Sequence, residues 1–175
     1  YISSYTTLIP FKAIPGNHDS LFGGIELFKD YFYNRNAPLA TGTQLYQHIT
    51  INDIHLFFLD VEWDAGTFDK AQHDWFESEL KKLDKNDIII VFSHAFYYSS
   101  GVMLDGAFWG DNKANIEQIV PLFEEYGVDM VFSGHNHHFE HLQKNNVNYY
   151  IAGGMGGGPE REPTFVSKAS VFHTT

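Results

Sequence analysis

Two predominantly apolar runs constrain the fold of this chain more than any other feature. They are IIIVF at residues 88–92, which is apolar throughout, and VDMVF at residues 128–132, in which Asp129 is the one polar residue. Runs of this kind are typical of strands that are covered on both faces of a sheet. The runs therefore predict a core of buried strands with other elements packed on each side.

The segments around these runs predict helices and hairpins. Apolar residues recur at helical intervals in 24–34, 68–83 and 115–127, which predicts three helices. Alternating apolar and polar residues on each side of Asn52–Asp53 predict a β-hairpin, and a second hairpin is predicted around residues 144–146.

Two shorter strands are predicted near the ends of the chain, at residues 11–14 and 167–174. The whole order is then hairpin, helix, strand, helix, strand, hairpin. This order predicts an α/β protein with two packed mixed β-sheets flanked by helices, and it disfavours a simple doubly wound sheet.

Length and composition limit the classes of function. The 175 residues suit a single domain, 1–175, with a substantial core. A net charge of -11, from 22 acidic and 11 basic residues, disfavours nucleic acid as a partner. We expect no membrane span, because no run of about 18 apolar residues occurs, and the lack of cysteine excludes disulfides. Residue 1 is Tyr and not Met, so we expect the chain to be a fragment of a longer parent.

Side chains of the metal-ligand type follow three of the predicted strands. Asn17 and His18 follow the segment 11–14, His94 follows the first apolar run, and His135 and His137 follow the second. Functional sites of open α/β sheets gather beyond the carboxyl ends of strands. Imidazole and amide groups are ligands for divalent metals. The sequence therefore predicts a metal site at this end of the sheet.

Each of these motifs also has a purely structural interpretation. GNHD at 16–19 is consistent with a turn in which Asp19 caps the next helix, and GHNHH is consistent with a surface loop. The predicted ligands carry no negative charge, although a stable site for one or two cations needs carboxylates as well. Asp60, at the end of IHLFFLD, is the first candidate for such a carboxylate, followed by Glu62 and Asp64.

In combination, three motifs resemble the later signature motifs of the calcineurin-like metallophosphoesterase superfamily. They are GNHD at 16–19, FSH at 92–94 and GHNH at 134–137. The segments between them resemble the purple acid phosphatase-like branch of that superfamily. The resemblance implies a four-layer α/β/β/α sandwich, and we expect its first strand-helix-strand unit to lie outside this chain.

The resemblance also implies a binuclear metal centre. Asn17, His94 and His135 would ligate the second of two divalent or trivalent metal ions, which would be Fe, Zn or Mn, and His137 would ligate the first. The activity implied is hydrolysis of a phosphomonoester or phosphodiester by a metal-bound hydroxide, as in an acid phosphatase. The implied partner is a small phosphorylated substrate, and the implied location is extracytoplasmic or secreted.

Two further roles follow from the same resemblance. His18 would stand beside the phosphate as an electrostatic stabiliser or general acid, and Asp19 would orient its imidazole. Purple acid phosphatases often carry a further His at the place of Met103 and an Arg at the place of His141. These differences would leave protonation of the leaving group more dependent on His18.

A larger difference concerns carboxylates. The superfamily opens with two Asp-bearing motifs, and no Asp lies upstream of Asp19. The alternative to an enzyme is therefore a catalytically inactive phosphoesterase-like structural or binding domain. The loop at 95–112 raises a separate choice, since its aromatic residues either border a substrate or close the core: Tyr97, Tyr98, Phe108 and Trp109.

Overall fold

The structure is a computed structural model of the whole chain. It describes residues 12–32, 41–42, 45–63, 65–104, 106–154, 158 and 161–175. No helix in these ranges is long and apolar enough to cross a membrane.

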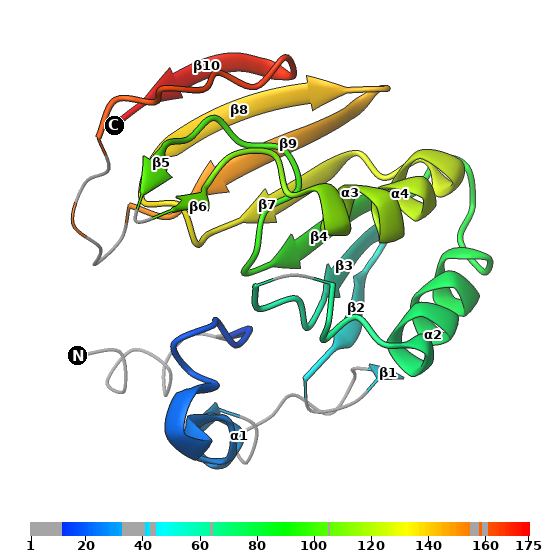
Figure 1. Cartoon of the computed structure of the whole chain (residues 1–175). Coiled ribbons are helices and arrows are strands. Elements are labelled where there is room, and N and C mark those ends of the chain that lie inside the picture. Colours follow the sequence, from blue (N-terminus) through cyan, green and yellow to red (C-terminus); the bar gives the residue numbers. More distant parts are fainter. Residues whose placement is uncertain are drawn as a thin grey trace.

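A mixed β-sheet of eight strands forms the body of the described chain (Figure 1), and its order is β1-β2-β3-β4-β7-β9-β8-β10. A ribbon of two strands, β5 and β6, stands apart from it. The strands are β1 (Thr41–Gly42), β2 (Gln47–Ile51), β3 (Ile54–Phe58), β4 (Ile88–Ser93), β5 (Met103–Leu104), β6 (Ala107–Phe108), β7 (Met130–Ser133), β8 (Phe139–Lys144), β9 (Val147–Ala152) and β10 (Ser170–Thr174).

The centre of the sheet is parallel and its edges are antiparallel. β3, β4, β7 and β9 run in the same direction, while β2–β3 and β8–β9 are the two predicted hairpins. In the register of β4 and β7, Ser93 lies opposite Ser133. The two buried strands therefore end side by side, and the residues that follow them leave the sheet at one edge.

Four α-helices accompany the sheet: α1 (Gly24–Phe32), α2 (Lys70–Leu80), α3 (Lys113–Gln118) and α4 (Val120–Tyr126). A short 3-10 turn, Leu21–Gly23, precedes α1. The Asp69 side chain caps α2 by accepting from the backbone N–H of Gln72. The predicted helix 115–127 is divided at Ile119, just before Pro121, and it ends at Gly127 in the left-handed conformation with φ 71°.

The apolar core lies between one face of the sheet and helices α2 and α4 (Figure 1). Phe57 of β3 contacts Phe76 of α2, with ring centroids 5.1 Å apart, and Phe76 contacts Phe123 of α4 at 6.1 Å. All three rings are fully buried. Because alternate residues of a strand point to opposite faces, the neighbours of these core residues point away from the helices.

A row of stacked rings crosses the other face of the sheet. It runs over Phe58, Phe92, Phe132, Tyr150 and His141, on β3, β4, β7, β9 and β8, with neighbouring centroids 4.7–5.5 Å apart. All of these residues are paired directly across the strands. Side chains in register on one face of a sheet stack in this way because their Cβ atoms lie close together.

The α/β class, the mixed sheet and the flanking helices agree with the expectation from the sequence. The predicted division into two packed sheets takes a different form, since the described strands join into one eight-stranded sheet with a two-stranded ribbon beside it. The predicted strand at 11–14 is wrong for residues 12–14, which have no regular structure, and residue 11 lies outside the described ranges.

Candidate functional site

Three of the predicted ligands meet beyond the carboxyl ends of β4 and β7. His94 Nε2 lies 2.9 Å from Asn17 Oδ1 and 3.2 Å from His135 Nδ1. These residues are 77 and 41 positions apart in the chain. The strand ends, and not local sequence, bring them together.

The backbone holds the two histidines at fixed positions. Gly134 N–H donates to the carbonyl of His94 at 2.9 Å, which joins the two loops, and Ala95 N–H donates to the carbonyl of Val61 at 2.8 Å. His135 has φ 65°, in the left-handed region that few residues other than glycine adopt. Residues in such conformations gather at functional sites, where the surrounding structure compensates for their strain.

The GNHD turn packs closely on His94. A Cβ atom at Gly16 would lie 2.8 Å from His94 Nδ1, so only glycine allows this approach. The Asp19 carboxylate accepts from the Gly16 backbone N–H at 2.8 Å, and the Asp19 N–H donates to the Gly16 carbonyl at 2.9 Å. Asp19 thus closes the turn, whereas the sequence predicted that it would orient the imidazole of His18. No hydrogen bond between Asp19 and His18 is present in the described part of the chain.

His18 and His137 are both exposed, and His137 Nδ1 lies 3.0 Å from the carbonyl oxygen of Gly158. Burial lowers the pKa of His94; the charge of Asp19 opposes that effect, and those of His18 and His137 add to it. His18, Asp19 and His137 therefore lie close enough to His94 for their charges to act on it.

Carboxylates do not join the cluster within the described residues. No group of three or more His, Asp or Glu residues that could hold a metal ion occurs there. Asp60 and Glu62 therefore do not complete a site with His94 and His135, and Asp64 lies outside the described ranges. Asp60 is instead 6% exposed, and burial raises the pKa of its carboxyl to about 7.

The aromatic residues of the 95–112 loop take different positions. Tyr97 is 1% exposed and belongs to the core, and Tyr98 packs against that core. Phe108 contacts Phe165, with centroids 5.1 Å apart. Trp109 reaches the cluster, where its ring stacks on His135, and Phe96 of the same loop also contacts His135.

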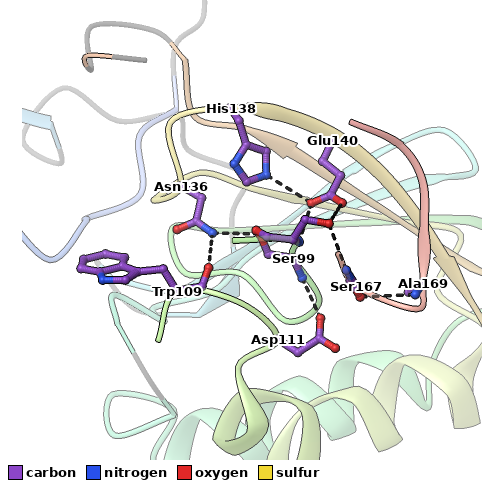
Figure 2. A network of polar contacts seen from close by, with 9 residues as sticks. Ser99, Trp109, Asp111, Asn136, His138, Glu140, Ser167 and Ala169 are labelled. Atoms are coloured by element: carbon purple, nitrogen blue, oxygen red, sulfur yellow. Dashed lines mark hydrogen bonds and ion pairs between the residues drawn. The ribbon is translucent and has the colours of Figure 1, made fainter. Parts of the chain in front are cut away.

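A buried carboxylate supports the loop that carries His135 and His137 (Figure 2). Glu140, which is fully buried, accepts from Ser100 N–H at 2.8 Å, from Ser100 Oγ at 2.6 Å and from His138 Nε2 at 3.2 Å. Burial by itself raises the pKa of Glu140, but the hydrogen bonds from His138 and Ser100 outweigh it and lower the pKa to about 2. This network ties β8 to the loop after β4.

Asn136 fixes the same loop from between the two histidines. Its Nδ2 donates to Ser99 Oγ at 2.8 Å and to the Trp109 carbonyl at 2.9 Å (Figure 2). A Cβ atom at Gly153 would lie 1.9 Å from the Asn136 carbonyl oxygen, so glycine is required there. The sequence analysis did not assign roles to Asn136 or Glu140. Period-2 spacing in the GHNHHFEH segment is the signal that separates His135 and His137 from the inward-pointing Asn136.

A second histidine cluster lies on the β2–β3 hairpin and was not predicted. His48 Nε2 lies 2.9 Å from His55 Nδ1, and the Thr50 hydroxyl lies 3.3 Å from both atoms. The outer nitrogens face carboxylates, with His48 Nδ1 at 2.9 Å from Glu79 and His55 Nε2 at 3.2 Å from Asp87. Both imidazoles are buried.

The comparison with known proteins agrees with the motifs. The sequence model of the calcineurin-like phosphoesterases matches residues 1–139, which is most of the chain. The chain belongs to the calcineurin-like phosphoesterase family. The predicted membership is therefore confirmed, and the relatives place the chain on the purple acid phosphatase-like branch.

Two relatives and one solved structure illustrate the similarity. The chain is 27% identical to purple acid phosphatase 15 of Arabidopsis thaliana over 178 residues, covering 92% of this chain and 32% of that protein. It is 29% identical to Fe(3+)-Zn(2+) purple acid phosphatase 12 of the same plant, covering 83% of this chain and 32% of the relative. The structure of purple acid phosphatase PPD1 from yellow lupin superposes with a TM-score of 0.65 at 16% identity, covering 92% of this chain and 32% of the lupin chain.

The chain covers only part of the length of these relatives. It spans about a third of the length of the curated relatives it matches. The relatives are acid phosphatases, and the family depends on metal ions.

Proposed function

We propose that this chain is the histidine-bearing part of a metal-dependent phosphoester hydrolase that acts on a small phosphorylated substrate as a phosphomonoesterase or phosphodiesterase. One observation carries the proposal: Asn17 Oδ1, His94 Nε2 and His135 Nδ1 converge from three separate segments to within 3.2 Å of their neighbours. We further propose that residues 1–175 form a single domain, and that the full-length protein acts outside the cytoplasm.

The donor set suits a metal ion. Imidazole nitrogens are ligands for Zn, Fe and Mn, and an amide oxygen suits the harder of these ions. When His94 Nε2 and His135 Nδ1 are both unprotonated, their lone pairs face one another beside the Asn17 oxygen, and a cation can take the place of the shared proton. Gly16 lets the Asn17 turn approach His94, because any side chain there would collide with the imidazole.

We assign Asn17, His94 and His135 to one ion and His137 to a second, and the ions would be divalent or trivalent Fe, Zn or Mn. When bound, such ions act as Lewis acids toward phosphoryl oxygens and lower the pKa of a water molecule. A two-ion centre also needs carboxylates. The proposal therefore requires the full-length protein to supply carboxylates that the described residues do not bring to His94 and His135.

His18 and Asp19 complete the proposed machinery. The His18 imidazole is exposed beside the cluster and is free to face a substrate, where it would donate a proton to the departing oxygen. Asp19 holds the turn through the Gly16 N–H, which fixes the backbone from which His18 and Asn17 project. One short turn would thus supply a metal ligand and an acid.

The test uses the purified full-length protein. We expect metal analysis to find bound Fe, Zn or Mn, and we expect hydrolysis of an aryl phosphate that falls more than about 100-fold in His135→Ala, since even partners of metal ligands cost 10- to 100-fold when removed. His73→Ala is the matched control, because His73 is 38% exposed on the surface of α2. Equal turnover in wild type and His135→Ala would reject the assignment.

A second candidate is a catalytically inactive phosphoesterase-like domain that serves as a structural or binding module. The observation that favours it is the lack of a carboxylate beside His94 and His135 among the described residues. The same experiment separates the candidates, because an inactive domain would hydrolyse no aryl phosphate at any metal concentration while remaining folded.

A further inference from the structure

Aromatic rings enclose His135 on several sides. The Trp109 ring is nearly parallel to the imidazole, at 10° and with centroids 5.2 Å apart. Trp63 stands perpendicular to it at 86° and 4.6 Å, and Phe96 lies at 5.7 Å. Trp63 and Trp109 also contact each other at 5.0 Å. A proposed metal ligand is therefore set against two indole rings.

The two tryptophans are anchored through their backbones. The Trp63 carbonyl accepts from Asn112 Nδ2 at 3.1 Å, and the Trp109 carbonyl accepts from Asn136 Nδ2 at 2.9 Å. A Cβ atom at Gly101 would lie 2.0 Å from the Trp109 carbonyl oxygen, which shows how closely that loop is packed. The indoles therefore occupy positions that the surrounding loops determine.

Exposure separates the rings that close the core from the ring that faces outward. Phe96 is 5% exposed and belongs to the core, whereas Trp63 is 45% exposed. A large aromatic side chain held at the edge of a polar site, with nearly half of its surface in solvent, is a typical recognition element. A ring that only covered His135 would not need to keep this much surface open.

We propose that Trp63, backed by Trp109, recognises a planar aromatic group on the substrate, so that the enzyme prefers small aryl phosphoesters over alkyl phosphoesters. This inference rests on the proposed function. The phosphoryl group would be held at the Asn17–His94–His135 cluster, and the ring of the leaving group would pack on the exposed surface of Trp63. Both residues lie in contact with His135, so one ligand can reach the cluster and the indole together.

The net charge limits the size of the substrate. At -11, the chain repels long polyanions, so the aromatic group is better supplied by a small ester than by a nucleic-acid strand. Aromatic contacts of this kind add about 3- to 10-fold in affinity beyond the burial of apolar area. Discrimination between aryl and alkyl esters should therefore be of this order.

The experiment measures binding, so that it does not depend on turnover. Phenylphosphonate and methylphosphonate, which resist hydrolysis, are titrated by calorimetry into the metal-loaded full-length protein and into two variants, Trp63→Ala and Trp63→Phe. We expect the wild type to bind phenylphosphonate about 3- to 10-fold more tightly than methylphosphonate. Trp63→Ala should lose that preference with unchanged binding of methylphosphonate, and Trp63→Phe should keep most of it.

Phe172→Ala serves as the matched control, because Phe172 is another exposed aromatic residue, at 53%, on the edge strand β10. A wild type that binds the two phosphonates equally would overturn the inference, and so would a Trp63→Ala variant that weakens both by the same factor. Failure of the proposed function has a different signature, which is the absence of aryl phosphate hydrolysis whatever the phosphonate preference. If Trp63→Ala does not fold, the wild-type preference for phenylphosphonate over methylphosphonate alone decides the inference.

Discussion

Two histidine clusters in the described part of the chain, one at the β2–β3 hairpin and one at the ends of β4 and β7, are built from the same residue type and differ in what surrounds it. At the β2–β3 hairpin, His48 and His55 lie between Glu79 and Asp87, so that a carboxylate faces the outer nitrogen of each ring. At the ends of β4 and β7, His94 and His135 meet an amide oxygen from Asn17 and no carboxylate within the described residues.

The partners of the outer ring nitrogens explain the difference. Hydrogen bonds join Glu79 to His48 and His48 to His55, and His55 Nε2 lies 3.2 Å from the Asp87 carboxylate. Burial lowers the pKa of His48, and the hydrogen bond and charge of Glu79 oppose that effect. At the hairpin, carboxylates face the outer nitrogens of both imidazoles. At the strand ends, the imidazole nitrogens and the amide oxygen are groups that can ligate a cation.

The largest expected effect is on activity, and it is measured by substituting one histidine from each cluster. We expect His94→Ala to reduce aryl phosphate hydrolysis by more than about 100-fold, because it removes a proposed metal ligand. His48→Ala should leave activity within about threefold of wild type at a temperature where it is folded. Steady-state kinetics on the full-length protein check this, and a large loss in His48→Ala with intact metal content would break the comparison.

Stability should show the opposite ranking. Glu79 is buried and accepts from His48 Nδ1, so Glu79→Ala leaves that buried donor unsatisfied and should cost about 1–3 kcal/mol. Glu117→Ala is the matched control, because Glu117 is exposed at the surface of α3 and pairs only with Lys113 at 3.6 Å. Urea unfolding at pH 7 measures both, and equal small losses in the two variants would contradict the prediction.

A carboxylate also supports the strand-end cluster, but from beneath the loop. The pKa of Glu140 is lowered to about 2, against 4.5 for an ordinary Glu. Because the folded-state value is the lower one, the stabilisation is complete above pH 4.5 and is lost as the pH falls toward 2. Its size is about 3 kcal/mol.

We therefore expect the free energy of unfolding to fall less steeply below pH 4.5 in Glu140→Gln than in wild type. Urea titrations at pH 7, 4.5 and 3 compare the two proteins, with Glu117→Gln as the control. Parallel pH profiles for Glu140→Gln and wild type would show that the hydrogen bonds from Ser100 and His138 do not hold the carboxylate ionised.

The smallest expected effect is on the ¹⁵N resonances of the imidazole rings, which should differ between the two histidine clusters. In ¹⁵N spectra of the imidazole rings at pH 7, we expect His48 Nδ1 to carry a proton, because it faces the Glu79 carboxylate at 2.9 Å. Addition of Zn²⁺ to the metal-free protein should shift the resonances of His94 and His135 and leave those of the hairpin pair in place. A Zn²⁺-dependent shift of the hairpin pair as large as that of His94 and His135 would contradict the comparison.

Much of the fold was accessible from sequence because it rests on local patterns. The buried runs 88–92 and 128–132 became β4 and β7, the Asn52–Asp53 turn joined the first hairpin, and Gly127 ended α4. The predicted strand at 11–14 was wrong for residues 12–14, because a short apolar run before a proline is typical both of a strand and of irregular chain. The break at Ile119 was missed because helical periodicity continues across it.

Some features of the candidate site could likewise be predicted from the sequence, and others could not. The three motifs GNHD, FSH and GHNH can be recognised in the sequence alone, and the family match supports their interpretation. The contact between Trp63 and His135 could not be predicted, since nothing in the loop after β3 marks Trp63 as a neighbour of His135. Asp60 was a reasonable carboxylate candidate by position, yet it turns to a buried site where its pKa rises.

The sequence by itself determined the alternation of strands and helices, the polar residues at the strand ends and the family, because hydrophobic periodicity and short motifs are properties of neighbouring residues. Only the tertiary structure decided which of ten histidines meet, and whether each meets a carboxylate or another imidazole. Those contacts join residues tens of positions apart, and their distances depend on strand register and loop packing, which no local pattern encodes.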